Sequence, residues 1–146
     1  MRRKRWRSLL KLRRAEERMK MRELARVLKD VASVRKRLRE IESERVRVLM
    51  WRKAKKGEST PELEWLRGEL LKALGDEERA LLKNLETLEL KAASKRSELV
   101  EAARKREAAE TLYRKAEDEW KDRFARQDAL ETVEFVDRAA FKTAEM

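Results

Sequence analysis

Hydrophobic residues in the first part of the chain recur at intervals of three and four. This spacing places side chains on one face of an α-helix, and its repetition over several turns is typical of the seam of a coiled coil. A step of only three residues from Val31 to Val34 follows the three-residue step before it, which predicts a stammer in the seam. The predicted seam positions of this first arm are Met21, Leu24, Leu28, Val31, Val34, Leu38, Ile41, Arg45 and Val48.

The second part of the chain continues the same alternation over eleven positions without a slip, and nine of these positions are apolar. They are Leu85, Leu88, Ala92, Lys95, Leu99, Ala102, Arg106, Ala109, Tyr113, Ala116 and Trp120. Nearer the start of this arm the apolar positions drift toward a wider stripe, formed by Leu63, Leu66, Leu70, Leu74, Leu81 and Leu85. Gly68 and Gly75 weaken a helix there by about 1 kcal/mol each relative to alanine, so we expect local flexibility without a break.

Between the two patterns lie the signals of a helix end followed by a helix start. Lys55 and Lys56 suit a helix C-terminus, Gly57 suits the left-handed position after it, Thr60 is a capping residue, and Pro61 fits the first helical position. The short connection favours antiparallel neighbours. We therefore predict an all-α fold, a long antiparallel two-helix coiled-coil hairpin that forms one domain over residues 1–146, with helices at about 3–56 and 61–140 and a turn at 57–60.

The two predicted arms are unequal. The first arm ends opposite about Ala116, so the last thirty residues have no partner within the chain. Large apolar side chains are denser in this overhang than in the seam, and an exposed apolar patch on a polar protein is typical of a contact site. We expect an external partner here, with self-association or a fold-back as the alternative. The residues concerned are Trp120, Phe124, Leu130, Val133, Phe135, Val136 and Phe141.

Composition narrows the functions that this hairpin can have. The chain of 146 residues contains no cysteine and no histidine, which excludes disulfides, zinc ribbons and nucleophilic sites built on these residues. Its three glycines are never closer than seven residues apart, so Gly-rich phosphate loops are also excluded. A two-helix ribbon offers no cleft in which catalytic pKa values could be shifted. We expect no enzymatic activity, no cofactor, no metal and no small-molecule substrate.

Charge is distributed unevenly along the chain. The net charge of +11 divides into +16 over residues 1–56 and −5 over residues 57–146. The favoured interpretation is that the two halves are partner helices whose flanking charges complement each other. The alternative is that the basic half binds nucleic acid or an acidic membrane surface. No run of eighteen apolar residues exists, so we expect no transmembrane helix and a cytoplasmic protein.

The start of the chain is its most basic segment, with eight cations and no acid in the first fourteen residues. Three interpretations remain open. Its cations could contact nucleic-acid phosphates, although no readout motif accompanies them. Trp6 and the arginines would suit a membrane-surface helix with a short apolar face. The arginines and Trp6 would also suit an acidic socket in a partner protein, with the tryptophan as the anchor.

Both ends of the chain resemble a known family. In residues 5–17, an aromatic residue lies between basic residues, a Leu-Leu-x-Leu-Arg segment follows it, and two glutamates end the stretch. Leu24 and Ala25 follow further along. Residues 134–140 carry an acidic residue, an apolar one and an arginine three positions further on, after Trp120 and Gln127. These features are similar to those of the flagellar export protein FliJ and its relatives, the central stalks of type III secretion. Length, helical hairpin and absence of cysteine agree with this resemblance over nearly the whole chain.

The resemblance implies a non-enzymatic central stalk that sits in the pore of a hexameric export ATPase and couples it to the export gate protein, and some members of the family also hold export chaperones. The protein would then lie peripherally at the cytoplasmic face of the inner membrane, through these partners. The residues expected at the ring-inserted end are Arg13, Arg14, Phe124, Phe135 and Arg138. Trp51, Trp65 and Leu66 flank the turn and are the expected contact with the export gate, or simply cap the hairpin tip. The alternative functions are a basic helical nucleic-acid-binding protein, in which nucleic acid is the less favoured partner, and a scaffold coiled coil.

Overall fold

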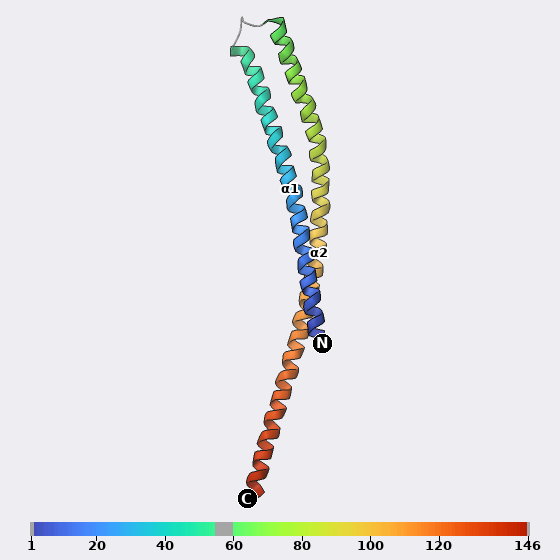
Figure 1. Cartoon of the computed structure of the whole chain (residues 1–146), viewed down its shortest axis with the longest axis vertical. Helices are drawn as coiled ribbons and strands as arrows, with labels where there is room; N and C mark the ends of the chain where they lie inside the picture. Colours follow the sequence, from blue (N-terminus) through green and yellow to red (C-terminus); the bar gives the residue numbers. More distant parts are fainter. Residues whose placement is uncertain (1, 55–59, 146) are drawn as a thin grey trace. The chain divides into compact units, whose positions relative to one another are not determined.

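Two long helices make up the fold. The structure is a computed structural model that describes residues 2–54 and 60–145. In these residues it contains helix α1 (Arg2–Ala54) and helix α2 (Pro61–Glu145), and no strand (Figure 1). The helices pack against each other as an all-α hairpin, which confirms the fold class predicted from the hydrophobic spacing.

Helix α2 begins with the cap that the sequence predicts. The side-chain oxygen of Thr60 accepts a hydrogen bond from the backbone N–H of Leu63 at 3.2 Å, and its carbonyl accepts the first helical bond from Glu64 at 3.0 Å. Pro61 occupies the first helical position, and Glu62 lies in the positive first turn. The predicted turn at residues 57–59, and the roles predicted for Lys55, Lys56 and Gly57, lie outside the described residues.

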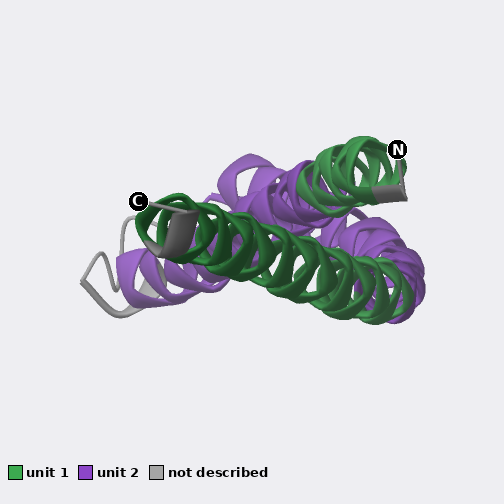
Figure 2. Cartoon of the chain, turned by 90° about the horizontal axis from the view of Figure 1, so that it is seen from below, with its two compact units in different colours: residues 1–19, 100–146 green, residues 20–99 purple. Residues whose placement is uncertain are grey.

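Residues 20–99 form one of two compact units of the chain, called unit 2 (Figure 2). In this unit the helices are antiparallel, because residues later in α1 pair with residues earlier in α2. Glu23 accepts from Lys95 at 3.1 Å, Arg35 donates to Glu89 at 3.0 Å, and Arg45 pairs with a glutamate nearer the start of α2. The buried side chains of unit 2 are Val27, Val31, Val34, Ile41, Leu74 and Ala92.

The seam of α1 in unit 2 differs from the prediction. Val27 is only 4% exposed, whereas Leu28 is 38% and Met21 50% exposed, so the last two lie outside the seam and the predicted stammer is wrong. The seam positions, all buried or half-buried, alternate strictly by four and three, and half-buried Glu23, Arg37 and Glu44 flank them. The seam positions are Lys20, Leu24, Val27, Val31, Val34, Leu38, Ile41, Arg45 and Val48. The prediction began the seam at the apolar Met21 and therefore did not count Lys20 as a seam position.

The start of α2 shows the same kind of difference. Leu63, Leu66 and Leu70, predicted as a stripe, are exposed. The seam positions are instead Arg67, Leu71, Leu74, Glu78 and Leu81, all buried or half-buried, and they join the predicted seam at Leu85 without a change of spacing. Gly75 and Glu77 beside them are also half-buried. Helix α2 also passes through Gly68 and Gly75 without a break. Charged residues can occupy seam positions here because partners across the seam neutralise them, as Arg45 does for Glu78.

Residues 1–19 and 100–146 form the other compact unit, called unit 1 (Figure 2). Its two helical parts are again antiparallel, since Arg14 lies 4.0 Å from Glu110 and Arg3 lies 3.9 Å from Glu117. The core is thin and consists of Leu10, Ala102 and Ala109. Alanine buries much less apolar area than leucine, so each layer of this interface stabilises the pair less than a leucine layer would.

Beyond Glu117, the only contact of α2 with another described part of unit 1 is that of Trp120 with Arg3. Every side chain of residues 118–143 is exposed, and within unit 1 the C-terminal part of α2 continues past the N-terminus of α1 (Figure 1). This confirms the predicted overhang and its beginning close to Ala116. Residues 118–143 are called the unpaired segment below.

Neither helix, over its described residues, contains a stretch that is both long and apolar enough to cross a membrane.

Candidate functional site

The unpaired segment begins at a stack of three side chains in unit 1. The guanidinium carbon of Arg3 lies 4.5 Å from the ring centroid of Trp120, and the Trp120 and Phe124 rings stack with centroids 5.6 Å apart and planes 16° apart. Arg3 also lies 3.9 Å from Glu117. A cation over an indole face is attracted by the ring quadrupole. The first turn of α1 therefore contacts α2 at the position where the paired part of unit 1 ends.

The sequence interpretation missed Arg3. Trp120 was expected as the last seam position, but it is 47% exposed, and its ring contacts Arg3 and Phe124. The signal that could have identified the contact is the register of the hairpin, which places the first turn of α1 opposite residues just beyond Ala116. The Arg-rich start supplies a cation at that level, and Trp120 supplies the aromatic face.

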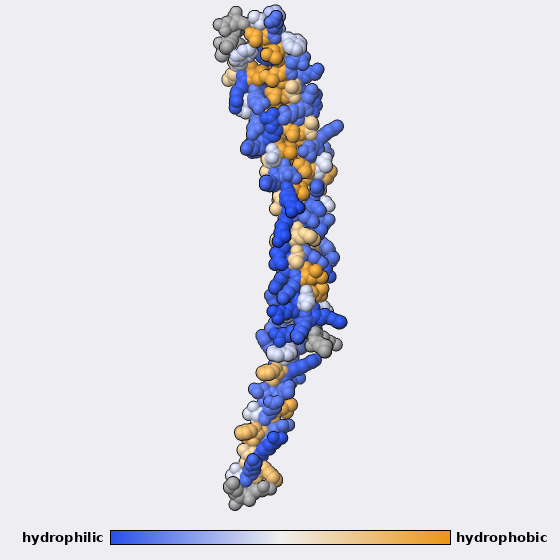
Figure 3. Space-filling model, in the orientation of Figure 1, coloured by the Kyte–Doolittle hydropathy of each residue, from blue (hydrophilic) through white to orange (hydrophobic). Residues whose placement is uncertain are grey.

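Further along, the unpaired segment exposes large apolar side chains on several sides. Phe124 and Phe135 are 61% and 73% exposed and lie eleven residues apart, close to three helical turns, so they share one face. Val133 precedes Phe135 by two residues and therefore lies about 200° around the helix from it. Leu130 and Phe141 lie on a third side. The space-filling view shows apolar side chains on both edges of this segment (Figure 3).

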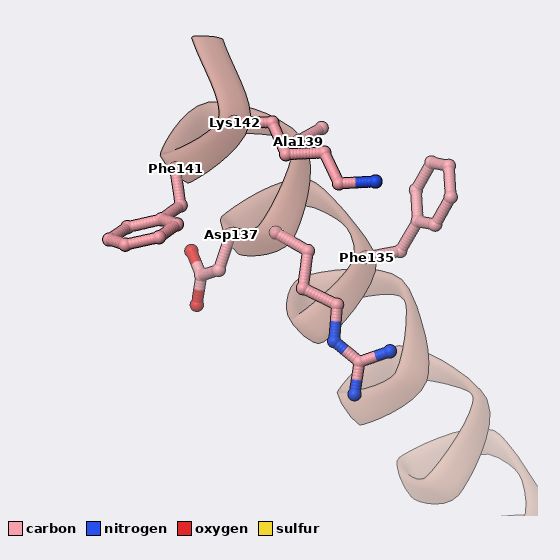
Figure 4. A pocket seen from close by; sticks show the side chains of 6 residues that line it. Phe135, Asp137, Ala139, Phe141 and Lys142 are labelled. Atoms are coloured by element: carbon pink, nitrogen blue, oxygen red, sulfur yellow. The ribbon is translucent and has the colours of Figure 1, made fainter. Parts of the chain in front are cut away.

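A shallow hollow lies near the end of the unpaired segment. In Figure 4, Phe135 and Lys142 point to one side of the helix, whereas Asp137 and Phe141 point to the other. The hollow is thus divided over two sides of one helix and is not an enclosed cavity. It is lined by Phe135, Asp137, Arg138, Ala139, Phe141 and Lys142.

The residues expected at the ring-inserted end all belong to unit 1, but they are not brought together. Arg13 is half-buried at the helix interface, where it donates to Glu16 at 3.0 Å. Arg14 is exposed, whereas Phe124, Phe135 and Arg138 lie along the unpaired segment. Among the described residues, no hydrogen bond, ion pair or ring contact joins any two of these five. They form an extended surface and not a compact site.

The residues expected at the turn belong to unit 2. Trp65 and Leu66 are exposed and line a shallow hollow together with Pro61 and Glu62. Trp51, close to the end of α1, is partly exposed. Because Pro61 and Glu62 form the first turn of α2, this apolar surface lies directly at the helix start.

One cluster of charged groups in the paired part of unit 1 is neutralised in place. Arg106 donates to Glu17 at 2.7 Å and to Glu110 at 2.9 Å. The hydrogen bond from Arg106 is the main cause that lowers the pKa of Glu110, with Arg114 and Arg14 adding to the effect. A carboxylate that stays ionised among three arginines holds α1 and α2 together and is not suited to proton transfer at neutral pH.

Unit 2 has a comparable cluster. Lys95 donates to Glu23 at 3.1 Å and lies 3.2 Å from Glu98. The bond lowers the pKa of Glu23 and raises the pKa of Lys95, in each case with the hydrogen-bond partner as the main cause. In the described part of the chain, no group of three or more acidic side chains is placed to hold a metal ion.

Comparison of the chain with protein-family models, with curated proteins and with solved structures found no match.

Proposed function

We propose that the protein is a non-enzymatic central stalk of a flagellar or type III protein-export apparatus, seated by its unpaired segment in the pore of the hexameric export ATPase. The observation that carries the proposal is the exposure of every side chain of residues 118–143, five of which are aromatic or leucine residues on different sides of one helix. A helix that is apolar on several sides is typically surrounded by its partner.

A ring of subunits is the kind of host that this segment fits. A partner with a single flat or grooved face would bury one side of the helix and leave the others exposed. Phe124 and Phe135 lie on one side and Val133 and Val136 on another, so contacts from several directions are needed to bury them. The pore of a hexamer offers several copies of the same surface around one axis.

Cations near the aromatics would provide the polar part of this contact. Arg138 lies three residues after Phe135, on an adjacent position of the helix surface, and makes no ion pair with another described residue. Arg14 is exposed and only distantly paired with Glu110, at 4.0 Å. Arginine pairs well with carboxylates at interfaces, so acidic loops of the ring are the expected partners. Arg13 is the remaining proposed contact, and it lies at the helix interface, where it donates a hydrogen bond to Glu16.

The apolar surface at the start of α2 is the proposed contact with the export gate protein. Trp65 and Leu66 are exposed next to Pro61, and Trp51 lies near the end of α1. Tryptophan is among the residues that most often dominate binding at protein interfaces. Export chaperones are further proposed partners, and the location at the cytoplasmic face of the inner membrane follows from the ATPase and the gate.

The proposal is tested by pull-down with the purified export ATPase hexamer of the same organism. Phe135→Ala together with Arg138→Ala should reduce retention at least tenfold, because the change removes an aromatic and its neighbouring cation. The matched control is Leu90→Ala together with Lys91→Ala, which removes an exposed apolar residue and an exposed cation from α2 in unit 2. Equal retention of both variants and the unmodified chain contradicts the proposal.

A second variant tests the surface at the turn independently of the unpaired segment. Trp65→Ala together with Leu66→Ala should abolish binding to the cytoplasmic domain of the gate protein while binding to the ATPase is unchanged. Loss of both interactions in this variant would contradict the assignment of the turn surface to the gate.

A further inference from the structure

The outer face of α1 in unit 2 carries a row of cations that no acid neutralises. All six are exposed, and none makes a hydrogen bond or ion pair with another residue in the described part of the chain. They are called the cationic face and consist of Arg22, Arg26, Lys29, Lys36, Arg39 and Arg47. The arginines that do pair with α2, such as Arg35 and Arg37, lie beside the seam and not on this face.

The cations are arranged in line along the helix. Arg22, Lys29 and Lys36 follow each other at intervals of seven residues, which is about two turns or 10 Å. The whole face runs from Arg22 to Arg47, a rise of about 40 Å. Measured from the seam, at about 3.5 residues per turn, all its members lie within about 100° of arc on the opposite side of the helix. These charges therefore form one straight positively charged edge.

Acids are nearly absent from this arc. Glu40 lies within it and is already paired with Arg37 at 3.4 Å. Asp30 lies at its edge, next to Lys29. On the exposed side of α2 in the same unit, by contrast, acids such as Glu69 and Glu86 alternate with lysines. The excess of positive charge is thus a property of α1, and pairing with α2 leaves it unneutralised.

Small polar and apolar residues separate the cations. The positions between them on the arc include Ala25, Ala32, Ser33 and Ser43, all exposed, and no aromatic residue. A membrane-surface helix needs large apolar side chains that insert below the headgroups. A protein partner needs buried aromatic or aliphatic anchors to bind tightly. The one larger apolar side chain on the arc is Val46, which is 48% exposed, and a single valine is too small an anchor for either partner. The face therefore favours a partner that is bound through charge.

We propose that the cationic face binds nucleic acid through its phosphate backbone, without sequence preference. Contacts with phosphates dominate nonspecific protein–DNA binding and require cations without apolar anchors. Four of the six cations are arginines, whose guanidinium groups match phosphate oxygens in pairs. The short side chains at Ala25, Ala32 and Ser33 leave room for a sugar–phosphate backbone along the helix. The inference is independent of the export proposal, because it concerns unit 2 and a different kind of partner.

The test measures binding of the full chain to a mixed-sequence DNA duplex about three helical turns long, by fluorescence anisotropy over a range of salt concentrations. With six phosphates neutralised, the slope of log K against log salt is about −5, which corresponds to a loss of about a thousandfold between 50 and 200 mM salt. Arg22→Gln, Lys29→Gln, Lys36→Gln and Arg39→Gln in one chain should reduce the slope to about −2. Because these side chains are exposed and unpaired, helix content by circular dichroism should stay unchanged.

A matched control removes the same charge from the other helix. Lys72, Lys83, Lys91 and Arg96 are exposed on α2 in unit 2 and unpaired among the described residues, and their replacement by Gln should leave the slope within about one unit of the original. Equal loss of binding in the two variants would show that net charge alone is responsible and would overturn the proposal.

The same titration distinguishes a membrane partner. Vesicles of equal parts phosphatidylcholine and phosphatidylglycerol should not compete for the chain at concentrations of acidic headgroup equal to that of DNA phosphate. Vesicles that displace the DNA, with the displacement abolished in the four-residue variant of α1, would assign this face to a membrane surface and overturn the proposal. An unmodified chain that shows no salt-dependent binding to the duplex also overturns it.

Discussion

Arg106 on α2 donates to Glu17 on α1 at 2.7 Å, and both residues occupy seam positions of unit 1. A charged pair at this depth contributes little net stability, because its desolvation offsets much of the attraction. Its effect on register is larger, since displacement of one helix along the other would leave both charges facing alanine or leucine. The alanine-rich seam on either side of Arg106 fits many registers, so the pair selects one of them.

Replacement of this pair should show that the ion pair itself contributes little net stability to the hairpin. Arg106→Ala alone should lower the melting temperature, because Glu17 loses its partner at a half-buried position. Arg106→Leu together with Glu17→Leu should raise it by several degrees, since leucine at a seam position buries more apolar area. Thermal unfolding followed by circular dichroism measures both effects. Glu101→Leu together with Lys105→Leu, at exposed positions, is the control and should leave the melting temperature unchanged. A destabilised double-leucine chain would mean that the ion pair contributes net stability.

Much of the fold could be predicted from the sequence, because the signals were local. Thr60 and Pro61 identify the start of α2 through capping chemistry, and the seam from Leu85 to Ala116 follows from uninterrupted spacing. The seam of α1 was assigned wrongly at Leu28, because the series was started at Met21 in place of Lys20, and the adjacent Val27 and Leu28 are both apolar. Whether Lys20 belongs to the seam depends on Glu98 across the interface, and that information is not local.

The candidate site was predictable in part for a similar reason. Exposure of Phe124 and Phe135 follows from the unequal lengths of the arms, which the position of the turn already determines. The stacking of Arg3 on Trp120 depends on the register of the hairpin to within one residue, and the spacing of apolar residues does not determine register so closely. The cationic face required knowledge of which arginines pair with α2, and only the structure distinguishes Arg35 from Arg39 in this respect.

Truncation of the most buried side chain should be costly. Ile41 is fully buried in the seam of unit 2, and Ile41→Ala should lower the free energy of unfolding by about 2–5 kcal/mol through lost burial and a cavity. Leu90→Ala removes an exposed leucine from α2 in the same unit and should change it by less than about 0.5 kcal/mol. Urea unfolding monitored at 222 nm measures both values. Similar losses in the two variants would show that the described seam is not the core of unit 2.

Stability should depend on pH in two ranges. Arg37 and Lys95 are the main causes that lower the pKa of Glu77 and Glu23 from the ordinary value of 4.5. Groups with a lowered pKa in the folded state stabilise it above the unfolded value, so their contribution is complete above about pH 5 and is lost as the pH falls through the folded values. The pKa of Lys95 is raised from 10.5, so its contribution is present below that value and is lost at higher pH.

The expected melting temperature is therefore constant between about pH 6 and pH 9 and falls on both sides. Glu23→Gln together with Glu77→Gln should make the acid side shallower, because these carboxylates no longer need to be protonated. Exposed Glu69 and Glu86 supply the matched control pair, whose replacement by Gln should leave the acid side as steep as before. An acid side of equal steepness in both pairs of variants would contradict the assigned role of Glu23 and Glu77.

The unpaired segment should respond to helix propensity differently from the seam. Because no described part of α1 packs against residues 121–143, their helix depends on intrinsic propensity and on continuity with the paired part of α2, and unsupported helices are marginally stable in water. Ala129→Gly, at an exposed position, should weaken the helix locally by about 1 kcal/mol and speed amide hydrogen exchange in the segment several-fold. The melting temperature of the paired helices should stay unchanged. Ala92→Gly, at a buried seam position, should instead lower the melting temperature clearly and leave exchange in the segment as it was. If Ala129→Gly lowered the melting temperature as much as Ala92→Gly, the segment would be packed against a partner, and its availability to a host would be disproved.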